Sequence, residues 1–243
     1  MNTITSILPS TAVAAPPAIV ATRRADVVVD DKITIPGWID NLESYRRWAE
    51  SDEYPQSGWV SFLDGAIWVD PNMEEFLTHN QIKQAFNTMF GIAMMQNPTG
   101  RFVPDRMFFA NEAANLATEP DGLFYLWATM QTGRLRLVPG KITGFMQIAG
   151  TPDVVLEIVS ESSESKDLVR LRELYWKAQI PEYWLVDARG DAIRFDILRH
   201  SADGYQATPA ELGCVRSEIL DRSFQIERSN DPLGMPLFRV QVK

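Results

Sequence analysis

The amino-acid sequence predicts an α/β fold in which α-helices flank a central mixed β-sheet. Residues 152–187 are typical of a strand, an amphipathic helix and a second strand. Two strands joined by such a crossover lie parallel in one sheet. Strand-like segments on both sides of this unit, and a helix-like segment before it, complete the pattern. This order of elements favours an α/β over an all-β architecture.

The chain of 243 residues is long enough for one domain with a substantial core. We predict a disordered tail over residues 1–32 and a single domain over residues 33–243. The first 25 residues are rich in Ala and Pro and have no periodic apolar face. A signal peptide is the alternative, but no basic residue precedes its apolar stretch and two prolines interrupt it.

The segment between the tail and the crossover unit predicts two helices and a series of strands. Residues 41–50 predict a short helix, and two strands around Asp64-Gly65 predict a hairpin, because this pair suits a tight turn. From Met73, apolar side chains recur at helical spacing up to a loop signal at residues 97–100. The strand candidates that follow are DRMFFAN, DGLFYLWAT, GRLRLV and GFMQIAG.

The first strand of the crossover unit, TPDVVLEIVS (residues 151–160), carries two acids in a strongly apolar segment. One face holds Val154, Leu156 and Ile158, whereas the other holds Asp153 and Glu157 besides two valines. An unpaired buried charge costs several kcal/mol or takes up a proton. The presence of these carboxylates therefore needs a physical explanation.

Asp121, at the start of the segment DGLFYLW, is a candidate to share a metal ion with Glu157. Residues four apart on a strand lie ~13 Å apart, so Asp153 and Glu157 cannot both ligate one ion. Carboxylates from adjacent strands can hold a hard cation such as Mg²⁺. Structural roles are the alternative: Asp153 starts a strand, Glu157 pairs with a buried arginine such as Arg170 or Arg172, and Asp121 belongs to a turn.

Residues 152–190 resemble the Uma-two family of proposed restriction endonucleases, which belongs to the PD-(D/E)XK nuclease superfamily. The matching elements are Pro152-Asp153, Glu157, Ser160, Asp167, Tyr175 and the string IPEYWLVD. Upstream, LDGAIWVD, the helix with His79 and TEPDGLFY take the places of the family's opening hairpin, first core helix and Pro-Asp strand. The resemblance covers about residues 35–240.

This resemblance implies a restriction-endonuclease-like core and a metal-dependent endonuclease that hydrolyses phosphodiester bonds in DNA. Asp121 and Glu157 would be ligands of Mg²⁺ or Mn²⁺, with the backbone carbonyl of Ile158 as a third ligand. The bound ion would polarise the phosphate and supply the attacking hydroxide from water. DNA is the implied substrate, and a homodimer is expected if both strands are cut.

The superfamily's lysine is missing from its usual positions. It normally lies two residues after the acid, where this chain has Val159, and in the resembled family it lies in the next helix, where this chain has Leu171. Lys166 is the expected substitute, because an arginine stays protonated and its planar fork has a different geometry. The alternative function is a catalytically degenerate nuclease-fold module with a binding or regulatory role. A metalloenzyme acting on another phosphodiester is a third class, since fold does not determine function.

Further candidates surround the two central acids. Residues expected to support the metal or its water are Glu74, His79, Asp153 and Asp167. For Glu74, the alternative is a solvated acid stabilised by the helix dipole. Candidates for phosphate contacts are Arg134, Arg136, Lys141 and Arg170. For the alternating Arg134 and Arg136, an exposed strand face is an equally simple explanation.

The composition narrows the setting in which the protein works. The net charge of −9, from 23 basic and 32 acidic residues, argues against non-specific adhesion to nucleic acid. The single cysteine, Cys214, excludes an intramolecular disulfide and a cysteine-based zinc site, which fits a reducing cytoplasm. No apolar run reaches the ~18 residues of a membrane-spanning helix, so no membrane partner is expected.

Overall fold

The computed structural model describes residues 24–140 and 143–243. Residues 1–23 of the predicted tail, and Lys141 among the predicted phosphate contacts, lie outside the described residues. The first described element is a hairpin of β1 (Val27–Val29) and β2 (Ile33–Ile35). Regular structure therefore begins before residue 33, within the range predicted as a tail.

In the remaining elements, runs of strands are interrupted by helices as far as α4 (Arg172–Lys177), and only strands follow that helix. In chain order they are α1 (Leu42–Ala49), β3 (Trp59–Leu63), β4 (Ala66–Asp70), the π-helical turn η1 (Phe76–Asn80), α2 (Gln81–Gln96), β5 (Gly100–Pro104), β6 (Phe108–Asn111), β7 (Leu116–Thr118), β8 (Gly122–Leu126), α3 (Trp127–Gln131), β9 (Leu135–Pro139), β10 (Phe145–Gly150), β11 (Val154–Ile158), the π-helical turn η2 (Lys166–Leu171), α4 (Arg172–Lys177), β12 (Glu182–Asp187), β13 (Arg194–Ser201), β14 (Gly204–Ala207), β15 (Ala210–Glu211), β16 (Cys214–Ser217), β17 (Arg222–Asn230) and β18 (Pro236–Val242).

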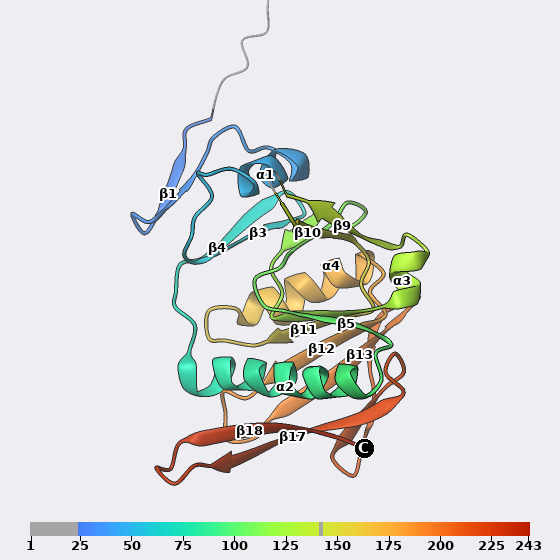
Figure 1. The fold of residues 1–243 in the computed structure, drawn as a ribbon. Helices are drawn as coiled ribbons and strands as arrows, with labels where there is room; N and C mark the ends of the chain where they lie inside the picture. The colour runs from blue at the N-terminus through green and yellow to red at the C-terminus, as the bar shows by residue number, and fades with distance from the viewer. Residues whose placement is uncertain (1–23, 141–142) are drawn as a thin grey trace, which may run out of the picture.

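These strands build three larger sheets in the described part of the chain (Figure 1). The upper sheet has the order β4-β3-β7-β6-β10-β9, the central sheet β14-β13-β12-β11-β8-β5 and the C-terminal sheet β15-β16-β17-β18. In the central sheet, β11 pairs in parallel with β12 and antiparallel with β8. The predicted α/β class with a mixed sheet is thus confirmed, although the strands divide among more sheets than the one expected.

Helices separate the sheets (Figure 1). The side chains of β11 alternate between the two resulting cores. Val155 packs with Leu174 and Tyr175 of α4, which lies between the central and upper sheets. Leu156 packs instead with the cluster around Phe86 of α2, which lies between the central and C-terminal sheets. α1 packs on the other side of the upper sheet. Because β11 is covered on both faces, nearly all of its side chains are apolar.

The predicted hairpin is confirmed, and the predicted strand DGLFYLWAT is corrected. β3 and β4 meet at Asp64 and Gly65, which have φ angles of 51° and 86°, as a tight hairpin turn requires. The segment DGLFYLWAT is strand β8 only up to Leu126, and α3 begins at the next residue. The Asp153 carboxylate accepts the N–H of Leu126 at 2.8 Å, which stabilises the change from strand to helix at this point.

No helix in residues 24–140 and 143–243 combines the length and the apolar character that a membrane crossing would require.

Candidate active site

Asp121 and Glu157 are brought together by the register of two neighbouring strands. β8 and β11 run antiparallel with Gly122 opposite Leu156. Asp121, the residue before β8, therefore lies level with Glu157. The Asp121 carboxylate accepts the backbone N–H of Ile158 through Oδ2 at 2.7 Å. Both acids line a cavity of about 360 Å³. Asp121 and Glu157 thus come from neighbouring strands to line one cavity, and their sharing of a metal ion stays a prediction.

Glu157 is almost completely buried, with 2% of its surface exposed. It lies on the face of β11 that points toward α4, where the Tyr175 hydroxyl donates a hydrogen bond to its Oε1 at 2.5 Å. Burial, reinforced by the negative charges of Asp167 and Asp121, raises the pKa of Glu157 to about 8. Lys166 and the hydrogen bond from Tyr175 act in the opposite direction but do not offset these effects. With a pKa of about 8, the Glu157 carboxyl is mostly protonated at neutral pH.

The alternative of a buried arginine beside Glu157 is wrong. Arg170 donates through Nη2 to the carbonyl of Leu63 at 2.9 Å, and Arg172 donates to the carbonyl of Tyr205 at 3.0 Å. Among the described residues, the positive charge that acts on Glu157 most strongly is that of Lys166.

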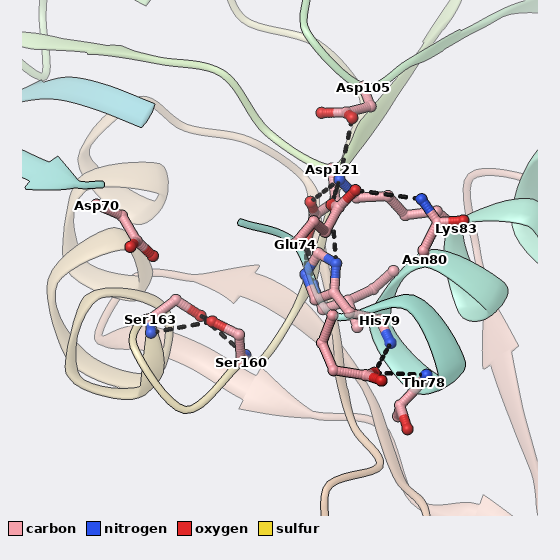
Figure 2. Close-up of polar contacts among 12 residues, drawn as sticks. Asp70, Glu74, Thr78, His79, Asn80, Lys83, Asp105, Asp121, Ser160 and Ser163 are labelled. Atoms are coloured by element: carbon pink, nitrogen blue, oxygen red, sulfur yellow. Dashed lines mark hydrogen bonds and ion pairs between the residues drawn. The ribbon is translucent and has the colours of Figure 1, made fainter. Parts of the chain in front are cut away.

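Around Asp121, cations and acids from three elements form a compact network (Figure 2). His79 Nε2 lies 3.3 Å from Asp121 Oδ2, and its Nδ1 lies 2.9 Å from Glu74 Oε1. The ammonium of Lys83, on α2, lies 2.9 Å from Asp121 Oδ1 and 3.0 Å from Asp105 Oδ2, and it also pairs with Glu74. One lysine thus joins three carboxylates.

This network sets the charges on its members. Burial alone would raise the pKa of Glu74, but the nearby cations His79 and Lys83 outweigh it and lower the pKa to about 2. The same two cations hold the pKa of Asp121 well below its ordinary range, against the effect of burial. Conversely, burial opposes the charge on His79, but Asp121 and Glu74 raise its pKa to about 10. Glu74 and Asp121 are therefore ionised and His79 is protonated at neutral pH, whereas burial raises the pKa of Asp105.

The donor set suits a divalent metal ion. Glu74, His79 and Asp121 each offer one ligand atom, and these atoms lie within 4.8 Å of one another. His79 Nδ1 and Asp105 Oδ1 are buried and make no hydrogen bond with proper geometry, although both lie within the network. Carboxylate oxygens suit Mg²⁺ and Mn²⁺, and an imidazole nitrogen favours the transition metal. The ammonium of Lys83 already pairs with Glu74 and Asp121. A metal ion would therefore compete with this ammonium for the two carboxylates.

On the opposite wall of the cavity, Lys166 and Asp167 form a buried pair. Lys166 is 8% exposed, and its Nζ lies 3.1 Å from Asp167 Oδ1 and 5.0 Å from the centre of the Trp68 ring. The Ser163 hydroxyl donates to the other oxygen of Asp167. Burial opposes the charge on Lys166, but Asp167 and Glu157 raise its pKa above the ordinary value. The structure therefore places Lys166 beside Glu157, whereas Leu171 is buried in the core.

Both cavity-lining helices begin with a π-helical turn. His79 lies in η1 and Lys166 lies in η2. The carboxylate of Glu75 caps η1 by accepting the backbone N–H groups of residues 77, 78 and 79. Glu75 therefore serves the helix, while Glu74 reaches the network around Asp121. Single π-helical turns occur frequently at functional sites.

Asp153 lies apart from the cavity, which corrects its expected supporting role. Its Oδ2 accepts the Leu126 N–H and, at 2.6 Å, the Thr129 hydroxyl, and Arg134 approaches its Oδ1 at 3.4 Å. These partners tie α3 to the start of β11. Asp153 shares a strand face with Glu157, as expected, but it stabilises the opposite end of the strand.

The arginines expected to contact phosphate are engaged elsewhere. Arg134 pairs with Asp153 and also donates to the carbonyl of Gln179. Arg136 is exposed and lies 3.6 Å from Glu112. Arg170 binds the Leu63 carbonyl. None of these three described arginines lines the cavity.

Sequence reasoning missed the role of Lys83 and Asp105 and gave Tyr175 no role at the site. His79 and Lys83 are four residues apart, a spacing that places both on one helical face, and this was the available signal for Lys83. Pro104-Asp105 repeats the Pro-Asp pair of Asp121. Tyr175 is one of the residues that carry the family resemblance, which was the available signal for it; it is fully buried and donates a hydrogen bond to Glu157.

Comparison with known proteins gives a family match and likenesses to solved structures. The family model Uma2, described as "Putative restriction endonuclease", matches residues 42–227. The crystal structure of "a putative nuclease belonging to DUF820" from Anabaena variabilis is similar at a TM-score of 0.54 and 13% identity. The match covers 74% of this chain and 90% of that one, and at this identity it shows the fold alone. No curated protein matches the chain.

Proposed function

We propose that this chain, which belongs to the Uma2 family, is a divalent-metal-dependent endonuclease that hydrolyses phosphodiester bonds in DNA. The observation that carries the proposal is the fixed placement of Asp121 beside Glu157 in one cavity. The hydrogen bond from Ile158 N–H to Asp121 holds the two acids level on neighbouring strands. The family match supports the nuclease class, and the metal, the DNA substrate and the residue roles are our proposals.

Asp121 and Glu157 would hold Mg²⁺ or Mn²⁺, and Glu74 and His79 would support it. A bound ion of this kind polarises the phosphate and lowers the pKa of a bound water. Tyr175 orients Glu157 through its hydroxyl. Asp167 holds Lys166 within the cavity, where a protonated lysine can donate hydrogen bonds to a phosphate oxygen and stabilise the charge that develops on it. His79 must lose its proton before it can act as a ligand.

A catalytically degenerate module is the second candidate, and Lys83 is the observation that favours it. Its ammonium already compensates the carboxylates of Glu74, Asp105 and Asp121. The position of the family's helical lysine is occupied by Leu171, which packs in the core. A chain that needs no metal ion for charge balance can keep the nuclease fold and bind nucleic acid without cleaving it.

Nicking of supercoiled plasmid separates the two candidates. The purified protein is incubated with Mg²⁺, Mn²⁺ or EDTA beside the isosteric variants Asp121→Asn and Glu157→Gln, and Glu112→Gln is the matched control on the exposed surface. Metal-dependent nicking that is lost in both site variants and kept in the control supports the endonuclease. A folded protein that nicks no substrate supports the degenerate module. Nicking that survives both site substitutions contradicts our assignment of the site.

A further inference from the structure

Two tryptophans from the β3–β4 hairpin line the cavity that holds the candidate active site. Trp59 and Trp68 lie on strands paired with Trp59 opposite Asp70 and Ser61 opposite Trp68. Residues opposite each other, and residues two apart, share one face of such a pair. Both indole rings and Asp70 therefore point from one face toward the acids of β8 and β11. Each tryptophan is half-buried, so part of its ring surface remains open to the cavity.

Each ring lies next to a lysine of the candidate site. Lys83, which contacts Asp121, lies 5.8 Å from the centre of the Trp59 ring. Lys166, which pairs with Asp167, lies 5.0 Å from the centre of the Trp68 ring. A planar group stacked on either ring would lie close to the residues proposed to hold the metal ion and the reacting phosphate.

Arg106 supplies an exposed cation beside this aromatic surface. Its guanidinium lies 5.1 Å from the centre of the Trp59 ring, and its one hydrogen bond to a described residue is a 3.5 Å contact with the carbonyl of Gln56. No carboxylate in the described part of the chain lies within ion-pair distance of it. An exposed guanidinium held over a tryptophan can bind a phosphate while the adjacent base stacks on the ring.

The electrostatics of the cavity disfavour a duplex more than a single strand. The acids that line it are Asp70, Glu74, Glu75, Glu119, Asp121, Glu157, Glu161 and Asp167. A DNA duplex carries one negative charge per ~1.7 Å of its axis, counting both strands. The cavity volume of about 360 Å³ is near the lower end for small-ligand sites, so it suits one extruded nucleotide better than a stack of base pairs.

We propose that this cavity takes an unpaired nucleotide of single-stranded DNA, whose base packs against both Trp59 and Trp68 and whose neighbouring phosphate binds Arg106. This inference rests on the proposed nuclease function and specifies its substrate class. Stacking on aromatic rings is tolerant of sequence, because every base presents a π-face. The preference is therefore for strand state rather than for a particular sequence.

Binding is tested apart from cleavage, by fluorescence anisotropy in Ca²⁺ and in EDTA. The probes are a labelled twelve-residue oligothymidine and a labelled twelve-base-pair duplex. The variants are Trp59→Leu, Trp68→Leu, Trp68→Phe and Arg106→Ala. Trp127→Leu is the matched control, because Trp127 is also part-exposed and carries an arginine, Arg101, 5.8 Å from its ring centre, yet it does not line the cavity.

We expect wild-type protein to bind the single strand more tightly than the duplex. The two leucine variants should weaken single-strand binding by roughly 5- to 150-fold, the range of one lost base–aromatic stack. Trp68→Phe should lose less than Trp68→Leu, because it keeps an aromatic face. Trp127→Leu should bind as wild type does, and Arg106→Ala should lose affinity with a reduced salt dependence. Thermal unfolding of each variant shows whether it is folded.

Tighter binding of the duplex than of the single strand would overturn the inference, as would leucine variants that bind the single strand like the control. If Trp68→Leu does not fold, the comparison of Trp59→Leu and Arg106→Ala with the control decides. The inference and the proposed function fail differently. Selective binding without metal-dependent cleavage of either the plasmid or the single strand overturns only the nuclease. Cleavage of duplex DNA that is unaffected by the tryptophan substitutions overturns only the single-strand inference.

Discussion

The Asp121 carboxylate accepts the backbone N–H of Ile158 at 2.7 Å, so an acid at the start of β8 is fixed to the peptide that follows Glu157. This bond explains how two acids 36 positions apart become neighbours in a buried part of the central sheet. It also uses one oxygen of Asp121 to hold the end of β11. The same carboxylate receives His79 on that oxygen and Lys83 on the other.

The stability of the metal-free protein should fall with rising pH because of Glu157. Its pKa is raised to about 8 in the folded state, whereas an unfolded glutamate titrates near ~4.3. Between these values the folded state holds a proton that the unfolded state releases, so stability is lost as pH rises. Glu157→Gln cannot ionise and should be more stable than wild type at pH ~8 in EDTA by about 1–3 kcal/mol, with little of this advantage at pH ~4. Urea unfolding at both pH values, with Glu112→Gln as control, measures it. An equal difference at the two pH values would contradict the assignment.

Lys83→Met should make the protein depend on a metal ion for stability. The substitution leaves the carboxylates of Glu74, Asp105 and Asp121 without their shared cation. Breaking a buried ion pair from one side costs about 3–5 kcal/mol. We expect added Mn²⁺ to raise the melting temperature of this variant by more than that of wild type, as measured by differential scanning fluorimetry. Lys177→Met removes an exposed lysine and serves as control. Equal effects of Mn²⁺ on wild type and Lys83→Met would show that Lys83 does not occupy the metal's place.

Lys166→Met should reduce nicking without removing metal binding. The lysine lies in the cavity next to Glu157 but pairs with Asp167. Loss of a single charge-stabilising donor typically lowers the rate by about 10²- to 10³-fold. Plasmid nicking measures the rate, and the Mn²⁺-dependent rise in melting temperature should persist. Lys177→Met, on the exposed side of α4, should nick as wild type does. An unchanged nicking rate in Lys166→Met would mean that either Lys83 stabilises the charge on the phosphate or no lysine takes part in the reaction.

Asp153→Ala should lower stability and leave the chemistry intact. The carboxylate holds the Leu126 N–H and the Thr129 hydroxyl at the start of α3. Loss of a buried acceptor leaves these donors unsatisfied and costs about 1–3 kcal/mol each. Chemical denaturation measures the change, and nicking is compared per folded molecule. A specific loss of nicking at unchanged stability would return Asp153 to the active site.

Local patterns in the sequence were sufficient for some of the main elements of the central and upper sheets. The strongly apolar segment around Glu157 predicted a buried strand, and Asp64-Gly65 predicted the hairpin turn. These signals are local, because side-chain periodicity and backbone preference act over a few residues. The family string around Glu157 and Tyr183 added the nuclease class.

The sequence by itself thus determined that Glu157 lies on a buried strand and that Asp121 and Lys166 are candidates to accompany it. Only the tertiary structure decided that Asp153 accepts hydrogen bonds at the start of α3. It also decided that Arg170 and Arg172 bind backbone carbonyls and that Lys83 pairs with the acids around Asp121. The physical reason is that such neighbours depend on strand register and on which helix covers which face. One residue of register, or one turn of a helix, moves a charged group several Å and changes its partner.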